Sequence, residues 1–299
     1  MAFGSTDLEN YISSQIKKYK GIIMPKKAGM LERMTRKKLP CERLHPNPAD
    51  EFCFPDIGPS FRIIGEYEQK IRKAQQYDLD PFEEPVMVEK MSPDGYLILN
   101  GHHRWAAAMR CGVTRIPVKI VNLTQETDIR KVLQNSKHDK RLSVDLDEVV
   151  FASADESLLM KPLPFPRRLF YKERIRIGIP AIFHFLAMHG YDIWLYTSAY
   201  YSYDYLKHLM HIYGVHADGV ITGAKRKTED NAETKEKIAG LQKLFRENYT
   251  ETLTFDGKGI LRTFASGRDF EHYELDCAPS DWPHEVMNVL EQLVKDNKI

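Results

Sequence analysis

Apolar and polar residues follow one another along this chain with helical and strand periods, and the order of these patterns changes near the middle. In the first half, apolar residues at helical spacing predict helices over 8–19, 64–77 and 103–111. Short apolar runs between turn residues predict strands over 85–90, 96–99 and 117–122. This mixture predicts a first domain of the α+β class that ends near Asn122.

Turn-forming residues separate these elements. The stretch 39–60 contains five prolines, which fix the backbone and lack amide donors, so we expect an extended segment rich in loops. Ser92-Pro93-Asp94-Gly95 joins the first two predicted strands and has the composition of a tight turn.

In the second half, strand and helix patterns alternate. A connecting helix is predicted over 126–137. Strands are predicted over 142–150, 192–196, 219–221 and 251–255, and helices over 181–189, 201–213 and 234–247. Such alternation is typical of an α/β fold, in which a parallel sheet carries helices on both faces. Ligands of these folds bind beyond the carboxyl ends of the strands.

The length of 299 residues favours two compact domains. We expect a basic helical arm over 1–38, the first domain over 39–123, the connecting helix within 124–140 and the second domain over 141–299. The net charge of +1 provides no global attraction for nucleic acid. Residues 1–40 hold nine Lys or Arg against three acids, which leaves a local contact with nucleic acid open, although a solvated face is the favoured interpretation.

Cysteine usage and the N-terminus indicate the compartment. The four cysteines are too scattered for a disulfide framework or a CxxC metal site. No basic segment followed by an apolar run opens the sequence, and no apolar stretch is long enough to cross a bilayer. We therefore expect a cytoplasmic protein with no membrane partner.

Two carboxylates end the first predicted strand of the second half. Asp145 and Asp147 are two positions apart, which places both on one side of an extended chain. One carboxylate can attack phosphorus and hold Mg²⁺, while the other exchanges the proton of the leaving group.

Further polar groups follow the later elements in order. Thr197 and Ser198 supply hydroxyls after the second strand, and Lys235 or Lys237 supplies an ammonium group at the start of a helix. Asp256 follows the fourth strand and offers an oxygen ligand for a metal. The alternative is structural, because Asp147, Thr197 and Asp256 could each cap a turn or helix and the lysines could be solvated.

With this order of residues, the segment 142–276 resembles the haloacid dehalogenase (HAD) superfamily of phosphatases. The resemblance implies a Rossmann-like domain in which Asp145 is the nucleophile and Asp147 the general acid and base. It further implies that Thr197 and one lysine bind phosphate, and that Asp145, Asp147 and Asp256 hold Mg²⁺ with the help of the Asp147 backbone carbonyl.

Two features of this half modify the prediction. The family places a second acid beside the fourth-strand aspartate or a few residues beyond it, but Gly257, Ile260 and Leu261 occupy those places here. The stretch 152–180 interleaves basic and aromatic residues. We expect it to cover the active site, where it either grips an acidic substrate or forms a solvated flap.

The first domain has its own candidate site. Gly101 follows the predicted strand 96–99, and His102, His103 and Arg104 open the next helix. A helix that starts after a glycine turn can bind an anion, and these three side chains add donors for phosphate. In the alternative interpretation the histidines only stabilise the turn and Trp105 packs inward.

This turn, with 39–122 around it, resembles the ParB/sulfiredoxin-like superfamily, whose members bind nucleotides at the equivalent position. His102 stands where sulfiredoxins carry their reactive cysteine, and the Glu-Arg-Arg of ParB is missing. The Gly-His-x-Arg form is also similar to the ADP-dependent serine kinases of this superfamily, and Glu42 is then the counterpart of their catalytic base.

The leading hypothesis is a Mg²⁺-dependent phosphohydrolase of the HAD type, joined to a ParB-like domain that binds a nucleotide or another phosphorylated small molecule. The first alternative is a nucleotide-dependent kinase or nucleotidase centred on Arg104. The second is a non-catalytic, nucleotide-sensing regulator with a degenerate second domain.

Overall fold

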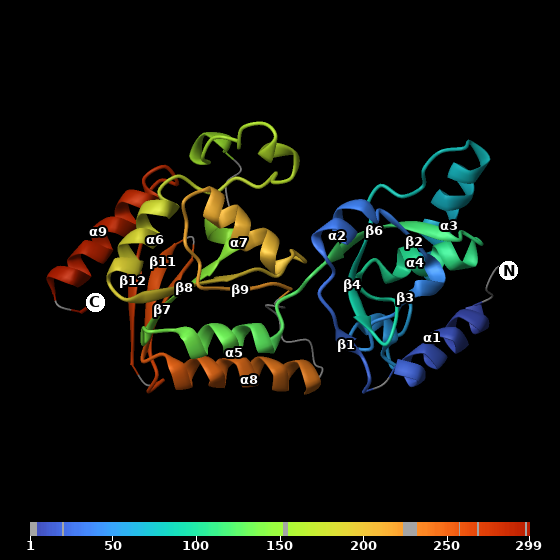
Figure 1. Cartoon of the computed structure of the whole chain (residues 1–299), viewed down its shortest axis with the longest axis horizontal. Coiled ribbons are helices and arrows are strands. Elements are labelled where there is room, and N and C mark those ends of the chain that lie inside the picture. The colour runs from blue at the N-terminus through green and yellow to red at the C-terminus, as the bar shows by residue number, and fades with distance from the viewer. Residues whose placement is uncertain are drawn as a thin grey trace. The chain divides into compact units, whose positions relative to one another are not determined.

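The computed structural model describes residues 5–19, 21–151, 155–223, 232–256, 258–267, 269–296 and 298–299, with the backbone alone for 5, 6 and 232–238. The chain forms two compact units, which divide between Asn122 and Leu123. Each unit is built on a mixed sheet with helices packed against it (Figure 1). The predicted α/β class is therefore confirmed at this level.

The sheet of the first unit has the strand order β2-β6-β4-β5-β3, and β1 pairs with β4 beside this path. The strands are β1 (Met24–Pro25), β2 (Lys38–Pro40), β3 (Leu44–His45), β4 (Val86–Ser92), β5 (Tyr96–Asn100) and β6 (Arg115–Val121). β4 runs parallel to β6 and antiparallel to β5. The hairpin of β4 and β5 was predicted from Ser92-Pro93-Asp94-Gly95. Gly95 is required there, because its φ is +80° and a Cβ atom would lie 2.3 Å from His45 Nε2.

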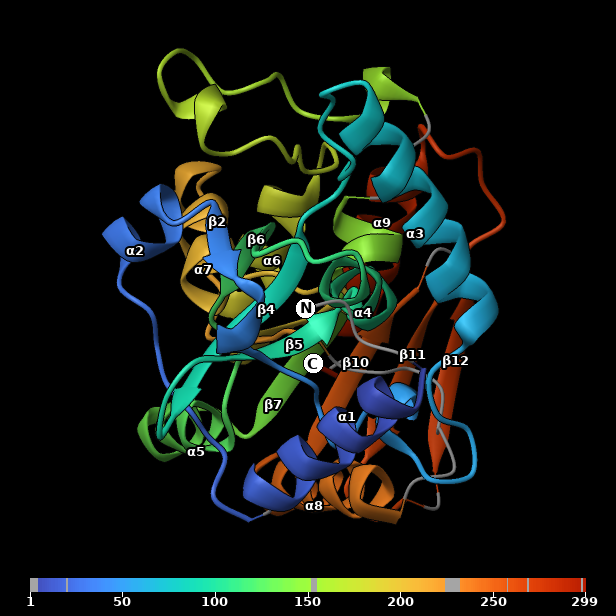
Figure 2. The same ribbon diagram turned by 90° about the vertical axis from the view of Figure 1, so that its right-hand side faces the viewer.

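The helices of the first unit are α1 (Ser5–Tyr19), α2 (Met30–Thr35), α3 (Phe61–Gln76) and α4 (His102–Arg110). α3 and α4 lie side by side (Figure 2). Leu8 and Ile12 of α1 are buried in the same core as Ile98 and Trp105. The helix at the start of the chain is thus part of the hydrophobic core of this unit.

The sheet of the second unit has the strand order β12-β11-β10-β7-β8-β9. The strands are β7 (Lys140–Asp145), β8 (Tyr191–Tyr196), β9 (Gly219–Ile221), β10 (Glu251–Phe255), β11 (Gly259–Phe264) and β12 (Phe270–Glu274). β10, β7, β8 and β9 are parallel, as predicted, but β11 and β12 are antiparallel to their neighbours. The predicted parallel arrangement therefore holds for the four predicted strands, while the complete sheet is mixed, because the chain reverses directly after β10 and adds two antiparallel strands.

The first strand of this unit is shorter than predicted. β7 ends at Asp145, and the backbone then forms a π-helical turn over Leu146–Val150 instead of continuing to residue 150. The Asp145 side chain caps this turn by accepting a hydrogen bond from the Glu148 amide at 2.8 Å. Apolar residues alone could not distinguish the two conformations, since Leu146 and Val149 are buried in the turn.

Helices cover both faces of the second sheet. They are α5 (Glu126–Asn135), α6 (Ile179–Met188), α7 (Tyr203–Ile212), α8 (Ala232–Asn248) and α9 (Trp282–Lys295). α6, α7 and α9 contribute to a large core cluster with β7, β8 and β10. α5 and α8 enclose a smaller cluster over Trp194 and Ile221 on the other face. None of the helices that the structure describes is long and apolar enough to cross a membrane.

Candidate functional sites

Asp145 lies at the carboxyl end of the second sheet. It is the last residue of β7, and its partner on the parallel strand β8 is Tyr196, which directly precedes Thr197. The carboxylate is half-buried and is oriented by the hydrogen bond from Glu148. The register of β7 and β8 therefore brings the first two candidate segments to the same edge of the sheet.

Asp147 and Thr197 are in direct contact. Thr197 is 1% exposed, and its Oγ1 donates a hydrogen bond to Asp147 Oδ2 at 2.8 Å. The same Oγ1 accepts a hydrogen bond from the Ala199 amide at 3.0 Å. The Thr197 hydroxyl must therefore turn away from Asp147 before it can donate to a phosphate. Ser198 is exposed, and the roles assigned to these residues stay predictions.

Two residues of this neighbourhood were not singled out from the sequence. Tyr201 is half-buried, and burial together with the negative charges of Glu173 and Asp147 raises its pKa to about 12. Glu173 in turn accepts a hydrogen bond from Tyr205. The phenol of Tyr201 is thus a neutral donor close to two carboxylates. The signal in the sequence was the run Tyr200-Tyr201-Ser202-Tyr203, which begins four residues after the end of the predicted strand 192–196.

Asp256 has a structural task. Its Oδ1 accepts hydrogen bonds from the amides of Lys258 and Gly259, both at 2.7 Å, and these bonds close the turn between β10 and β11. The side chains of Lys235 and Lys237, the two candidate phosphate-binding lysines, lie outside the described residues. The capping alternative for Asp256 therefore has a direct geometric basis.

The carboxylate oxygens at this edge of the sheet are suitable ligands for Mg²⁺, but the described side chains do not form a complete coordination shell. Among the residues that the structure describes, no three His, Cys, Asp or Glu side chains gather in a metal-binding group. Mg²⁺ commonly takes only one or two carboxylates and completes its shell with water and substrate phosphate. The Asp145 carboxylate and the Asp147 backbone carbonyl fit that pattern, and the Mg²⁺ site stays a prediction.

The segment between the π-helical turn and α6 is anchored by arginines. Arg176 is buried, donates from Nη2 to the Pro279 carbonyl at 2.6 Å, and lies over the Trp282 ring. Arg174 donates from Nε to the Met160 carbonyl at 2.7 Å. Arg174 and Arg176, two of the basic residues in the stretch predicted to cover the active site, therefore hold the segment itself in place. Phe165 of the same segment is exposed.

The first unit holds the Gly-His-His-Arg turn where the sequence predicts it. Gly101 follows β5 in a left-handed conformation (φ +96°) and precedes the first turn of α4. A Cβ atom at this position would lie 3.2 Å from both Arg104 Nη2 and Val86 Cγ2. Both the backbone angle and the close approach therefore favour glycine.

Both histidines of this turn act as hydrogen-bond acceptors. His102 is buried, and its Nε2 accepts from the Asn47 amide at 3.1 Å. His103 Nε2 accepts from the Ser60 amide at 3.2 Å, and burial lowers the pKa of its ring. Phe52 contacts both rings. The neutral histidines thus fix the proline-rich segment to α4.

Arg104 is buried and reaches out from α4. Its Nη1 donates to the Glu84 carbonyl at 2.8 Å and forms an ion pair with Glu84 Oε2 at 3.2 Å. The Glu84 side chain is exposed, so this ion pair can exchange with another anion. Glu42, the candidate base, is exposed in a 3₁₀ turn.

Comparison with known protein families gives a match for part of the first half of the chain. A sequence profile of the ParB N-terminal domain matches residues 70–137, which include the turn at Gly101. The predicted ParB-like character is confirmed for that segment. The match ends before β7, and the comparisons give no support for the HAD-like assignment of 141–299, which stays a prediction.

A particular structure in this class is the C-terminally truncated chromosome-partitioning protein ParB from Caulobacter crescentus, complexed with CTP-γ-S. The chain is similar to it with 24% sequence identity and a TM-score of 0.24. The similarity covers 34% of this chain and 55% of that one, about half of its length. No curated protein matches the chain.

Proposed function

We propose that the second unit is a phosphoric ester hydrolase that forms an aspartyl-phosphate on Asp145. The observation that carries the proposal is the placement of Asp145, Asp147 and Thr197 at the ends of the paired strands β7 and β8, with Thr197 Oγ1 bonded to Asp147 at 2.8 Å. Carboxyl ends of parallel strands are the usual ligand-binding edge of α/β sheets. The order of residues along the chain adds the resemblance to HAD phosphatases.

The reaction proceeds in two displacements at phosphorus. A carboxylate oxygen of Asp145 attacks the phosphorus of a phosphomonoester, the bond to the ester oxygen breaks, and Asp147 gives its proton to the leaving alcohol. Water then attacks the phosphorus of the aspartyl-phosphate and loses a proton to Asp147. Phosphate leaves, and both carboxyl groups return to their initial states.

Mg²⁺ is the cofactor in this proposal. The Asp145 carboxylate and the backbone carbonyl of Asp147 would hold it, and its charge would neutralise the phosphoryl oxygens. Thr197 would orient the substrate after its hydroxyl leaves Asp147, and Tyr201 would supply a neutral hydrogen-bond donor. Phosphorylated small molecules and nucleotides are the proposed substrates.

The test is turnover of a panel of nucleotides, sugar phosphates and p-nitrophenyl phosphate, with and without Mg²⁺. We expect Asp145→Asn to lower kcat at least about a thousandfold, because the nucleophile is lost. The circular dichroism spectrum and urea midpoint should stay close to those of the native protein, because the amide oxygen can still accept from Glu148.

Glu148→Gln is the matched control, because it removes an exposed negative charge three residues from Asp145. Its kcat should stay within about threefold of the native value. Undiminished turnover in Asp145→Asn would refute the aspartyl-phosphate mechanism. Absence of turnover on every phosphoester in the native protein would instead favour the non-catalytic regulator.

For the first unit, we propose nucleotide binding at the turn of Gly101 and Arg104. Gly101 permits the left-handed turn that starts α4 and lets Arg104 pack against it, and the Arg104 ion pair with an exposed carboxylate can be replaced by phosphate. The match to the ParB N-terminal domain over 70–137 supports this assignment.

Binding of CTP, ATP and ADP by calorimetry tests this second proposal. Arg104→Gln should weaken binding about tenfold or more, because a charge-assisted bond to phosphate is lost. Lys73→Ala, which removes an exposed charge from α3, should leave affinity unchanged. Equal affinities for the native protein and Arg104→Gln would contradict the assignment.

A further inference from the structure

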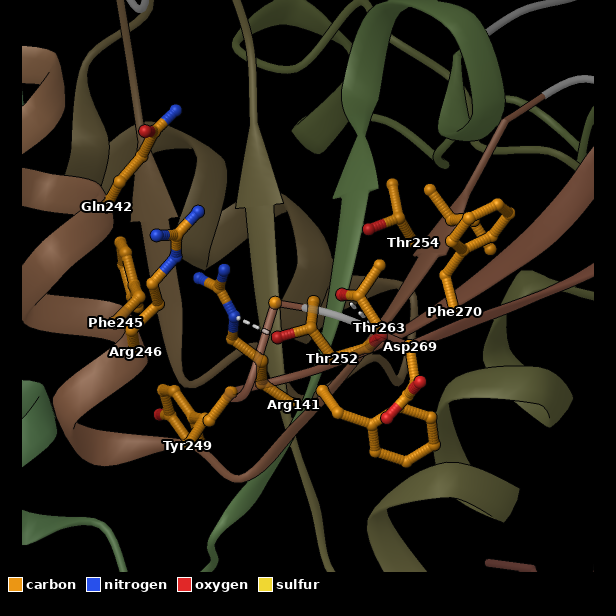
Figure 3. Close-up of a pocket in the computed structure, with 14 residues that line it drawn as sticks. Arg141, Gln242, Phe245, Arg246, Tyr249, Thr252, Thr254, Thr263, Asp269 and Phe270 are labelled. Atoms are coloured by element: carbon orange, nitrogen blue, oxygen red, sulfur yellow. Dashed lines mark hydrogen bonds between the residues drawn. The ribbon is translucent and has the colours of Figure 1, made fainter.

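A cavity of about 550 Å³ lies between α8 and one face of the second sheet. Its wall consists of one face of α8 and the side chains that project from β7, β10, β11 and the start of β12 (Figure 3). Thr252, Thr254 and Thr263 are half-exposed on this face, while their neighbours Leu253 and Phe255 are buried on the other. The volume lies within the range of small-molecule sites.

This cavity is separate from the proposed hydrolytic site. Arg141, which supplies the β7 part of the wall, precedes Asp145 by four residues, about 13 Å along the strand. Asp145 and Asp147 are not among the lining residues. An occupant of the cavity therefore binds independently of the aspartyl-phosphate chemistry.

Arg141 is held in place before any ligand binds. Its guanidinium lies 4.0 Å from the centre of the Phe245 ring, Nε donates to Thr252 Oγ1 at 2.9 Å, and Nη1 donates to Tyr196 Oη at 2.8 Å. Burial raises the pKa of Tyr196, so its phenol is neutral and leaves the arginine charge uncompensated. Nη2 makes no hydrogen bond to any residue that the structure describes. A half-buried cation with spare donors favours an anion.

The other polar groups agree with an anionic ligand. Arg246 of α8 also lines the cavity, against a single lining carboxylate, Asp269. Within the described part of the chain, neither Arg141 nor Arg246 has a carboxylate in salt-bridge range. Thr254 and Thr263 add hydroxyls at the cavity floor.

The remaining wall is apolar and aromatic. Phe264 and Leu261 line the β11 side, and Phe270 stands at the rim with 70% of its surface exposed. An exposed phenylalanine beside a cationic cavity is suited to stack on a planar ring. The cavity thus combines a place for a phosphate group with a surface for an aromatic group.

We propose that this cavity binds an aromatic phosphomonoester of the size of a nucleoside monophosphate. Arg141, Arg246 and the threonine hydroxyls bind the phosphate, and Phe270 packs against the ring. Asp269 is placed to accept hydrogen bonds from hydroxyl or amino groups of the ligand.

The probe is adenosine 5′-monophosphate, titrated into the full-length Asp145→Asn protein by calorimetry, with adenosine and inorganic phosphate in parallel. Use of Asp145→Asn keeps the probe intact whether or not the proposed hydrolase is correct. We expect saturable binding of the monophosphate, and at least about tenfold weaker binding of adenosine and of phosphate alone.

Arg246→Ala and Thr254→Val are the test variants, and Lys243→Ala is the control. Lys243 is an exposed cation on the same helix, but it does not line the cavity. Arg246→Ala and Thr254→Val should each weaken binding about threefold to tenfold, and Lys243→Ala should not. The proposal is overturned if the monophosphate does not bind, if adenosine or phosphate binds as tightly, or if all three variants behave alike.

Discussion

His102 and His103 of the first unit use the same atom for the same purpose. Each Nε2 accepts a backbone amide from the proline-rich segment, across 55 and 43 positions of the sequence. The local role of Gly101 could be predicted, because a glycine between strand and helix indicates a tight turn. The hydrogen-bond partners of the two histidines could not be predicted, because a contact between residues so far apart in the sequence leaves no periodic pattern of hydrophobic and polar residues.

His45 is a buried histidine of this unit with a strongly lowered pKa. It is 5% exposed, its Nδ1 lies 2.9 Å from Gln15 Oε1, and its Nε2 is buried without a hydrogen-bond partner among the described residues. Burial lowers its pKa to about 4. A second proton on the ring would have no acceptor, so the folded state keeps His45 neutral.

We expect the first unit to lose stability as the pH falls from about 6.5 toward 4. In that window the unfolded chain binds a proton at His45 and the folded chain does not, so protonation favours unfolding. The urea midpoint of the Trp105 indole signal in NMR spectra should be lower at pH 4.5 than at pH 7. His45→Asn keeps a donor for Gln15 but cannot titrate, and its midpoint should depend less on pH. An equal pH dependence in both proteins would exclude His45 as the cause.

At the scale of elements, most strands and helices followed from periodicity. The short elements β1, α2, β2 and β3 of the first unit were not predicted, and neither were β11, β12 and α9 of the second. β11 places Arg262 on its buried face, and β12 exposes Phe270 while Glu271 faces the other side. Charged residues at core positions break the alternation by which strands are recognised. Because β11 was not predicted, the turn between β10 and β11 was not predicted either, and neither was the role of Asp256 in closing that turn.

Arg262 is the centre of a buried network. Nη2 lies 2.7 Å from Glu251 Oε2, Nη1 lies 3.0 Å from Glu271 Oε2, and Glu251 also accepts from Tyr191. The Arg262 and Glu251 side chains are each 7% exposed. The network therefore joins β11 to β10, β12 and β8.

We expect Arg262→Met to lower the unfolding free energy of the second unit by about 3–5 kcal/mol, because Glu251 is left as an uncompensated buried charge. Adding Glu251→Gln should recover part of the loss. Urea denaturation followed by the Trp282 fluorescence or indole signal measures both variants. A loss below about 1 kcal/mol for Arg262→Met would show that the network contributes little to stability.

At the scale of the whole molecule, each unit encloses its own hydrophobic core. The buried cluster around Ile98 and Trp105 belongs to residues before Asn122, and the cluster around Ile193 and Trp282 belongs to residues after it. The change of pattern near the middle of the sequence indicated two domains, because short-range periodicity reports the local class of fold. The contact between Asp147 and Thr197 could be expected from the sequence, because the carboxyl ends of neighbouring parallel strands lie together. The cavity between α8 and the sheet could not, because it depends on how the side chains of one helix pack over the strands.

This division predicts that core mutations act on one unit at a time. Ile98→Ala and Ile193→Ala each remove a fully buried side chain and should cost about 2–5 kcal/mol in their own unit. The tryptophans report the units separately, since Trp105 lies in the first and Trp194 and Trp282 lie in the second. Ile98→Ala should lower the urea midpoint of the Trp105 indole signal and leave the other two unchanged, and Ile193→Ala should do the reverse. A common shift of all three signals in either variant would mean that the two cores unfold as one cooperative structure.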